Sequence, residues 1–338
     1  MIRKLVVRLF KMFLPTNFVL WIQKYRVIGR LLYLNYYGNK QGILKTPWVC
    51  MLPFDPKASV EYINEVYNDY FIHSGIPYSY IKGKRVLEIG PGENLGVGMR
   101  FLAEGASLVV SVDRFRSLRN YLDQEAVYQQ LINKMSEKER EQFGDCITFS
   151  DHGYRLDEKR YLYLANKAIE DITIKSFPEK FNLIVSRAVL EHVSNIEAAF
   201  NIMDSLLFSG GYMVHEVDFR DHGIFSGYGM NPLTFLSIND HLWKAMSSKT
   251  GAPNRKIKGT YVTLLEKYNY KYRIINKLVV GSNKKNQKAD ITLGIDYQRS
   301  SLDFVKEIRK NLATEFKNIP DEELLVAGII ISAQKLKP

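Results

Sequence analysis

The stretch Val86-Leu87-Glu88-Ile89-Gly90-Pro91-Gly92-Glu93-Asn94 decides the fold of this 338-residue chain. Residues 85–89 (RVLEI) predict a buried strand, and the glycines that follow predict a tight turn before a helix. Glycines at such a turn permit positive backbone dihedrals and let main-chain N–H groups approach a ligand closely. The stretch is therefore typical of a nucleotide-binding turn in a Rossmann-like domain.

The spacing of the glycines argues against a dinucleotide site. A dinucleotide fingerprint places its third glycine three residues after Gly92, but Leu95 stands there, and the next glycines are Gly96 and Gly98. The sequence therefore favours a nucleotide-binding turn of another kind.

From residue 81 onward, strand-like and helix-like segments alternate, which is typical of a mostly parallel sheet with crossover helices. The secure strands are residues 85–89, 108–112, 181–186 and 212–217, and residues 270–280 and 326–333 are candidates for a closing antiparallel pair. The chain between Arg114 and Asp171 is longer than one helix requires, so we expect an inserted helical element there.

Three features of this region resemble the class I (Rossmann-like) S-adenosylmethionine-dependent methyltransferases. They are Glu88 two positions before the first glycine, the segment FNLIVSRAVLEHV at 181–193, and the pair Gly210-Gly211. The sequence is similar to bacterial methyltransferase-domain proteins from about residue 81 to its end. The resemblance implies an α/β fold with a seven-stranded, mostly parallel sheet closed by an antiparallel strand. It also implies an enzyme with S-adenosylmethionine as its cofactor.

The resemblance further implies which residues contact the cofactor. Gly90 and Gly92 would shape the turn around its methionine part, with Glu88 and Asn94 at the amino-acid group. Asp113 lies 21 residues past Gly92 at the end of the second strand, where a carboxylate can accept both ribose hydroxyls. The alternative for Asp113 is a helix N-cap.

The adenine contacts depart from the family pattern. Related enzymes often carry Asp-Ala-Glu after the third strand, whereas this chain has Ala168-Ile169-Glu170-Asp171. We therefore expect Glu170, together with Ile169, at the adenine. Arg187, after the fourth strand, completes the expected cofactor contacts. For His192 we favour a structural hydrogen-bonding role.

Residues 215–223 (HEVDFRDHG) form a run dense in titratable groups after the fifth strand, where ligands bind in open α/β sheets. His222 is the candidate catalytic base, oriented by Asp218 or Asp221; the alternative is a loop whose charges pair with Arg220. Residues 230–256 are a second candidate substrate element, with Trp243 for stacking and Lys249, Arg255 and Lys256 for phosphate. Plain helix packing explains the same residues.

The N-terminal region is basic and partly amphipathic. Residues 1–54 contain no Asp or Glu and hold nine cations: Arg3, Lys4, Arg8, Lys11, Lys24, Arg26, Arg30, Lys40 and Lys45. Residues 1–14 have the spacing of a short basic amphipathic helix, and aromatic residues follow it. We expect residues 1–80 to form a helical extension to a domain of residues 81–338. The extension either rests on an anionic membrane surface or packs as a lid.

These features lead to a functional expectation with open alternatives. We expect methylation of an oxygen in a glycan, lipid-linked sugar or related small molecule at the membrane. RNA methylation is an alternative that the net charge of +11 allows, although no Asn-Pro-Pro-Tyr-type motif follows the fourth strand. A binding protein that retains the cofactor but has lost the reaction is another.

Two further expectations concern location and metals. No apolar run reaches the roughly 20 residues that a spanning helix needs, and Arg8 and Lys11 interrupt a signal-peptide core. Cys50 and Cys146 have neither metal-like nor disulfide-framework spacing, so we expect no metal site and a reducing cytoplasm. A peripheral position on the inner face of the membrane is compatible with both expectations. The sequence does not predict an oligomeric state.

Overall fold

A computed structural model describes residues 15–37, 54–116, 120–151, 153–177, 179–281 and 299–336. The chain divides into two compact units. The sheet unit comprises residues 51–218, 258–275 and 329–338, and the helical unit comprises residues 1–50, 219–257 and 276–328. The predicted domain boundary at residue 80 stays a prediction.

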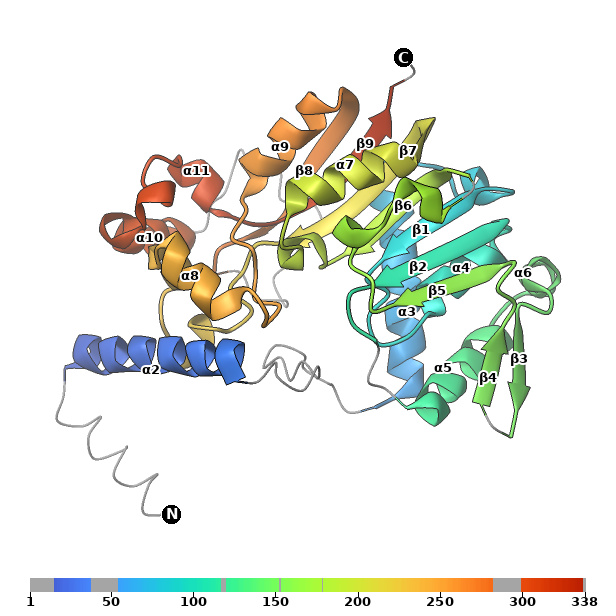
Figure 1. Cartoon of the computed structure of the whole chain (residues 1–338), viewed down its shortest axis with the longest axis horizontal. Coiled ribbons are helices and arrows are strands. Elements are labelled where there is room, and N and C mark those ends of the chain that lie inside the picture. The colour runs from blue at the N-terminus through green and yellow to red at the C-terminus, as the bar shows by residue number, and fades with distance from the viewer. Residues whose placement is uncertain are drawn as a thin grey trace. The chain divides into compact units, whose positions relative to one another are not determined.

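The described residues form a seven-stranded sheet with the strand order β5-β2-β1-β6-β7-β9-β8 (Figure 1). The strands are β1 (Arg85–Ile89), β2 (Leu108–Asp113), β5 (Tyr161–Ala165), β6 (Phe181–Arg187), β7 (Leu207–Asp218), β8 (Tyr270–Val279) and β9 (Val326–Lys335). Neighbours from β5 to β7 run parallel. β9 runs antiparallel to β7, because Phe219 N–H donates to Ala327 O while Gln334 Nε2 donates to Gly210 O. The predicted α/β class and closing strand are confirmed.

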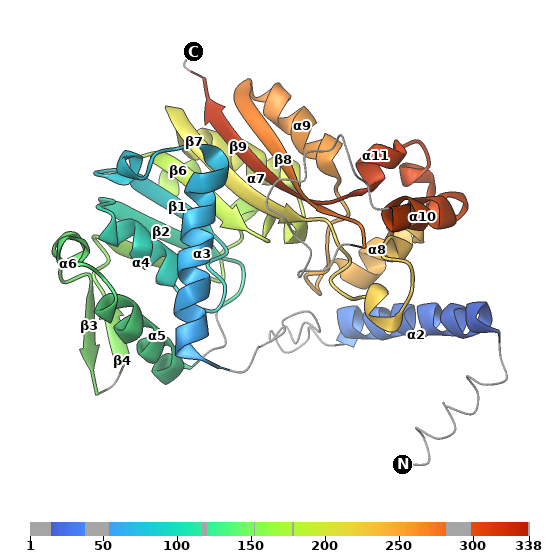
Figure 2. The ribbon, with the colours of Figure 1, turned by 180° about the vertical axis from the view of Figure 1, so that it is seen from behind.

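Helices cover both faces of the sheet (Figures 1 and 2). One face carries α3 (Pro56–Ser74), α4 (Gly96–Ala103) and α5 (Tyr121–Asn133), and the other carries α7 (Ile196–Leu206) and α9 (Lys258–Lys267). Because both faces are covered, the central strands are nearly continuous apolar runs, and Val86, Val109 and Leu183 join Phe101 in one core. The 3-10 turns of this unit are η1 (Tyr78–Ile81), η2 (Ile169–Asp171), η3 (Ile174–Ser176) and η4 (Leu190–His192).

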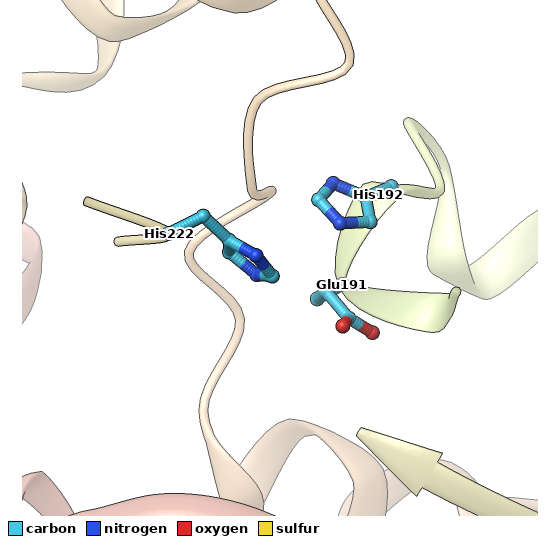
Figure 3. A group of neighbouring side chains, drawn as sticks. All are labelled: Glu191, His192 and His222. Atoms are coloured by element: carbon cyan, nitrogen blue, oxygen red, sulfur yellow. The ribbon is translucent and has the colours of Figure 1, made fainter. Parts of the chain in front are cut away.

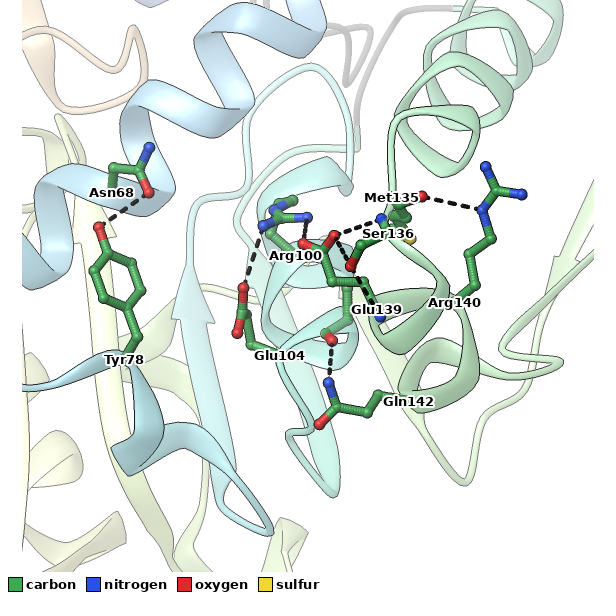
Figure 4. Close-up of polar contacts among 10 residues, drawn as sticks. Asn68, Tyr78, Arg100, Glu104, Met135, Ser136, Glu139, Arg140 and Gln142 are labelled. Carbon is green, nitrogen blue, oxygen red and sulfur yellow. Dashed lines mark hydrogen bonds and ion pairs between the residues drawn. The ribbon is translucent and has the colours of Figure 1, made fainter.

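The predicted insertion between Arg114 and Asp171 contains more than helices. It consists of α5, α6 (Glu137–Phe143), a hairpin of β3 (Ile147–Ser150) with β4 (Gly153–Leu156), and then β5. The charged run that opens α6 is a capping box, in which Ser136 and Glu139 satisfy each other's backbone N–H groups. Arg100 of α4 binds Glu139 at 2.6 Å, so these charges attach α6 to α4 (Figure 4).

The glycine pair 210–211 lies within β7. The register with β6 shifts between Phe181 and Leu183, which pair with Leu207 and Tyr212, so the intervening residues of β7 bulge. Gly210 has a φ of 82°, a conformation that suits glycine at a bulge.

The helical unit has a core of its own. Its helices are α2 (Thr16–Tyr37), α8 (Asp240–Ser247), α10 (Arg299–Ile308) and α11 (Asp321–Leu324), with 3-10 turns η5 (Ser226–Tyr228), η6 (Thr234–Ser237), η8 (Arg309–Asn311) and η9 (Thr314–Phe316). Ile28 and Leu31 of α2 are buried with Trp243 and Val305. The predicted amphipathic helix at 1–14 lies outside the described residues. Among the residues that are described, no helix is long and apolar enough to span a bilayer.

Candidate functional site

The turn after β1 contains two glycines that the backbone requires for different reasons. Gly90 and Gly92 have φ values of 69° and 77°, in the left-handed region that favours glycine. A Cβ on Gly90 would lie 2.4 Å from Val189 Cγ2, so this glycine allows the turn to pack against the segment after β6. A Cβ on Gly92 would meet nothing within 4 Å, so the backbone there faces open space. An exposed strand-to-helix turn of this kind fits the methionine part of a nucleotide cofactor.

Two buried tyrosines hold the end of this turn. Leu95 N–H donates to Tyr128 Oη at 3.0 Å, and Tyr161 Oη donates to Leu95 O at 3.1 Å. Gly98 makes room for Tyr161, because a Cβ on Gly98 would lie 2.1 Å from the tyrosine oxygen. Sequence reasoning missed both tyrosines, which lie 33 and 66 residues from Leu95 along the chain.

Asn94 lies two residues before the helix that follows the turn. Its Oδ1 accepts a hydrogen bond from Gly96 N–H at 2.9 Å, which satisfies one of the first N–H groups of α4. The expected contact of Asn94 with the amino-acid group of the cofactor stays a prediction.

Glu88 is a buried carboxyl beneath the turn. Its side chain accepts a hydrogen bond from Ser111 Oγ at 2.8 Å, and Ser111 in turn lies 2.9 Å from Tyr161 Oη. Burial raises the pKa of Glu88 to about 7, an effect that the hydrogen bond from Ser111 opposes and the charge of Asp113 increases. A carboxyl that titrates near neutrality gains from an adjacent cation, which is what the ammonium of an amino-acid group supplies.

Asp113 ends β2 beside the same turn. Its Oδ1 accepts from Phe115 N–H at 2.9 Å, and burial raises its pKa to about 6 against the hydrogen bonds from Phe115 and Gly92. Asn120 caps α5, since its side chain accepts from Asp123 N–H. Asp113 is therefore not the N-cap of α5, and its position fits a ribose contact.

The expected adenine residues lie in η2. Ile169 is buried, and Glu170 Oε1 accepts a hydrogen bond from Ser194 N–H at 3.3 Å. This bond attaches η2 to the segment that leads into α7. The adenine contacts of Ile169 and Glu170 stay predictions.

Arg187 ends β6 and joins it to two other elements. The guanidinium contacts Asp69 at 2.8 Å and Glu65 at 3.2 Å, both on α3, and Glu216 of β7 at 3.6 Å. Burial would lower the pKa of Arg187, but the surrounding groups, Glu216 first among them, raise it above its ordinary value. The cation thus holds α3 across the ends of β6 and β7, and its expected cofactor contact stays a prediction.

Comparison with known proteins identifies the family. A family model described as a methyltransferase domain matches residues 71–273, which is more than half of the chain. The chain belongs to the methyltransferase domain family. It is an S-adenosylmethionine-dependent methyltransferase, and the turn at Gly90 and Gly92 with Asp113 fits that cofactor. The expectation drawn from the sequence resemblance is therefore confirmed.

Solved structures similar to this chain include three methyltransferases. An S-adenosylmethionine-dependent methyltransferase from Mesorhizobium loti is 15% identical, with 80% of this chain and 99% of that chain covered and a TM-score of 0.40. Phosphoethanolamine N-methyltransferase 2 of Haemonchus contortus, in complex with S-adenosylmethionine, is 11% identical, with 88% and 61% covered and a TM-score of 0.43. Magnesium protoporphyrin IX methyltransferase of Synechocystis PCC 6803 is 12% identical, with 90% and 96% covered and a TM-score of 0.39. A search of curated proteins found no significant match.

The segment after β7 contains Asp221, a carboxylate that accepts several backbone hydrogen bonds. Asp221 is buried, and its oxygens accept from Gly223 N–H at 3.0 Å and from the N–H groups of Phe225 and Ser226, each at 2.7 Å. These bonds build the turn that holds His222, whose φ is 50°. Sequence reasoning missed this structural role of Asp221. The catalytic roles expected of His222, Asp218 and Asp221 stay predictions.

Glu191 and His192 are neighbours in η4, after β6; Figure 3 draws both, together with His222 of the helical unit. Burial raises the pKa of Glu191 well above its ordinary value, and the charge of Asp218 raises it further.

Two residues of the segment 230–256 pack inside the helical unit. Trp243 is buried, and its Nε1 donates to Pro253 O at 3.0 Å. Arg255 is also buried, with its guanidinium 4.9 Å from the Trp243 ring centre and 5.0 Å from that of Phe316. The interpretation of these two side chains as stacking and phosphate-binding groups is wrong, and the packing alternative is correct.

Proposed function

We propose that this methyltransferase transfers its methyl group to an oxygen of a glycan, lipid-linked sugar or related small molecule at a membrane surface. The observation that carries the cofactor half of this proposal is the exposed turn at Gly92 beside Asp113 at the ends of β1 and β2. Support for the membrane half comes from residues 1–54, which hold nine cations and no carboxylate.

Each cofactor contact in this proposal has a distinct task. Glu88 and Asn94 bind the amino-acid group, and the carboxylate of Asp113 accepts the ribose hydroxyls. Ile169 and Glu170 lie against the adenine. Arg187 contacts the cofactor from the end of β6, where its ion pairs with three carboxylates also hold α3 in place.

For methyl transfer the protein mainly has to position the acceptor hydroxyl and remove its proton. Bound S-adenosylmethionine supplies an electrophilic methyl group on a positively charged sulfur. An acceptor hydroxyl must lie in line with that methyl group and lose its proton. His222 is the proposed base, Asp221 fixes the turn that carries it, and Asp218 is a further candidate to orient it.

Methyl transfer from labelled S-adenosylmethionine to fractionated extracts tests the acceptor. We expect label in the lipid and glycan fractions, and a large loss of rate in His222→Gln but not in the matched control His241→Gln, an exposed histidine of α8. A peripheral site on the inner face of a membrane predicts that the labelled fraction is membrane-derived.

RNA methylation is the alternative favoured by the net charge of +11. Label that enters RNA and is released by ribonuclease would support this alternative and contradict a glycan or lipid acceptor. Binding of S-adenosylmethionine with no transfer to any fraction would instead favour a non-catalytic binding protein.

A further inference from the structure

Helix α2 is fixed to the helical unit by one of its faces. Val27, Ile28 and Leu31 are buried in the core of that unit. Polar contacts extend the same face, because Asn35 Nδ2 donates to Ala245 O at 2.8 Å and Lys24 Nζ donates to Ser237 Oγ at 2.8 Å. The helix therefore has a fixed rotation about its own axis, which determines what its other face presents.

The opposite face of α2 is a stripe of exposed aromatic side chains. The exposed fraction of these side chains ranges from 37% for Ile22 to 67% for Tyr36. The stripe comprises Ile22 and six aromatic residues: Phe18, Trp21, Tyr25, Tyr33, Tyr36 and Tyr37. With about 3.6 residues per turn, most of them fall on one side of the helix, centred on Gly29. The rings of Trp21 and Tyr25 lie 4.8 Å apart, so they form a continuous apolar surface.

Charge on α2 is of one sign. The helix contains Lys24, Arg26 and Arg30 and no Asp or Glu, and both arginines are exposed beside the aromatic stripe. An aromatic stripe bordered only by cations matches the lipid headgroup region, where Trp and Tyr rings are favoured and anionic lipids attract Lys and Arg.

We propose that this exposed face of α2 lies flat in the interface of an anionic lipid bilayer and holds the methyltransferase there. The inference rests on the proposed membrane location of the acceptor and names the surface that provides it. The buried face of α2 is already used within the helical unit, so packing as a lid would have to use this same aromatic stripe. The single sign of its charge favours an anionic lipid surface over a covering protein face of mixed charge.

Flotation of the full chain with vesicles tests the surface. We expect binding to phosphatidylcholine vesicles that contain phosphatidylglycerol and much weaker binding to phosphatidylcholine alone. Tyr25→Ala should weaken partitioning about tenfold, and Arg26→Ala about fivefold. The matched controls are Tyr121→Ala, an exposed tyrosine of α5, and Lys271→Ala, an exposed lysine of β8; both should bind as the wild type does.

The wavelength of tryptophan emission tests whether α2 enters the lipid. Trp21 is 54% exposed, so its emission should shift to shorter wavelength on anionic vesicles. Trp21→Phe should lose most of that shift while retaining binding, because phenylalanine keeps the apolar ring. An unchanged emission shift in Trp21→Phe would overturn the proposal.

Other results would also overturn it. One is absence of binding to anionic vesicles. Another is binding by Tyr25→Ala and Arg26→Ala that equals the binding of the wild type. A third is a dimer in lipid-free solution that Tyr25→Ala dissociates. S-adenosylmethionine titrations of the same samples separate the two proposals. Intact cofactor binding without flotation refutes only the lipid surface, whereas flotation without cofactor binding refutes the proposed function.

Discussion

Replacing Glu88 by Gln should stabilise the cofactor-free protein while weakening cofactor binding. Glutamine has nearly the same shape and can still accept the hydrogen bond from Ser111, so the turn after β1 keeps its packing. What changes is the charge. In the wild type, burial raises the pKa of Glu88 from 4.5 to about 7, which means that the buried carboxylate destabilises the fold whenever it is ionised.

The magnitude follows from the pKa. A change from 4.5 to about 7 corresponds to about 3 kcal/mol, because one pKa unit is worth about 1.4 kcal/mol. The folded-state pKa is raised, so the stabilising contribution is fully present below pH 4.5 and is lost as the pH rises through 7. The free energy of unfolding of Glu88→Gln, relative to wild type, should therefore increase by up to about 3 kcal/mol between pH 4.5 and pH 8.

Urea denaturation at these two pH values measures the effect. Glu158→Gln, an exposed carboxyl in a turn, is the matched control and should show no comparable dependence on pH. Calorimetry at pH 8 should show S-adenosylmethionine binding to Glu88→Gln weakened about tenfold or more, because a hydrogen bond to a charged group is lost. The reasoning fails if Glu88→Gln is less stable than wild type at pH 8, or if cofactor affinity is unchanged.

Four further predictions follow from the site. Cofactor affinity should fall about tenfold or more from pH 8 to pH 6 in calorimetry, because Glu88 and Asp113, whose pKa values are raised to about 7 and about 6, must be ionised to bind; a flat profile would contradict this. Gly90→Ala should destabilise the fold by about 2 kcal/mol or more in urea, since its methyl group meets Val189, whereas Gly92→Ala should mainly lose cofactor binding; equal effects in both assays would be inconsistent with the geometry. Arg187→Ala should cost about 3 kcal/mol in the same assay because three carboxylates lose their cation. A cost below that of Arg85→Ala, which loses one exposed carboxylate and two backbone carbonyl partners, would count against the bridge to α3. Asp221→Ala should cost about 2 kcal/mol, because three backbone N–H groups lose their acceptor, and a fully stable variant with lower activity would show that Asp221 acts in catalysis instead.

The parts of this site that sequence predicted are local. Glu88, Gly90 and Gly92 stand within five residues of one another, and the need for positive φ at a strand-to-helix turn can be seen from the glycines alone. The ribose contact of Asp113 comes from the resemblance to the class I methyltransferases, together with its place at the end of an apolar run, and stays a prediction. In both cases the sequence supplies a residue type and its place in one element.

The parts that were missed depend on contacts between distant segments. Tyr128 and Tyr161 hold Leu95 from far along the chain, and nothing in their neighbourhoods marks them as partners of the turn. The β3–β4 hairpin escaped because each strand has four residues, too few to show a reliable alternation.

The misread residues Arg255 and Trp243 have the same cause. They resembled a phosphate-binding group and a stacking group because their burial depends on residues distant along the chain, such as Phe316 beside Arg255 and Val305 in the core with Trp243. Composition and spacing reveal the residue types, whereas tertiary contacts decide between a structural and a functional use.

Calorimetric titration with S-adenosylmethionine tests the central claim most directly. The wild type should bind the cofactor, while Asp113→Ala should bind it much more weakly, and Gly92→Arg, which fills the open space at the turn, should not bind it at all. Absence of binding by the folded wild type, or equal binding by all three proteins, would contradict the assignment of this turn as the cofactor site.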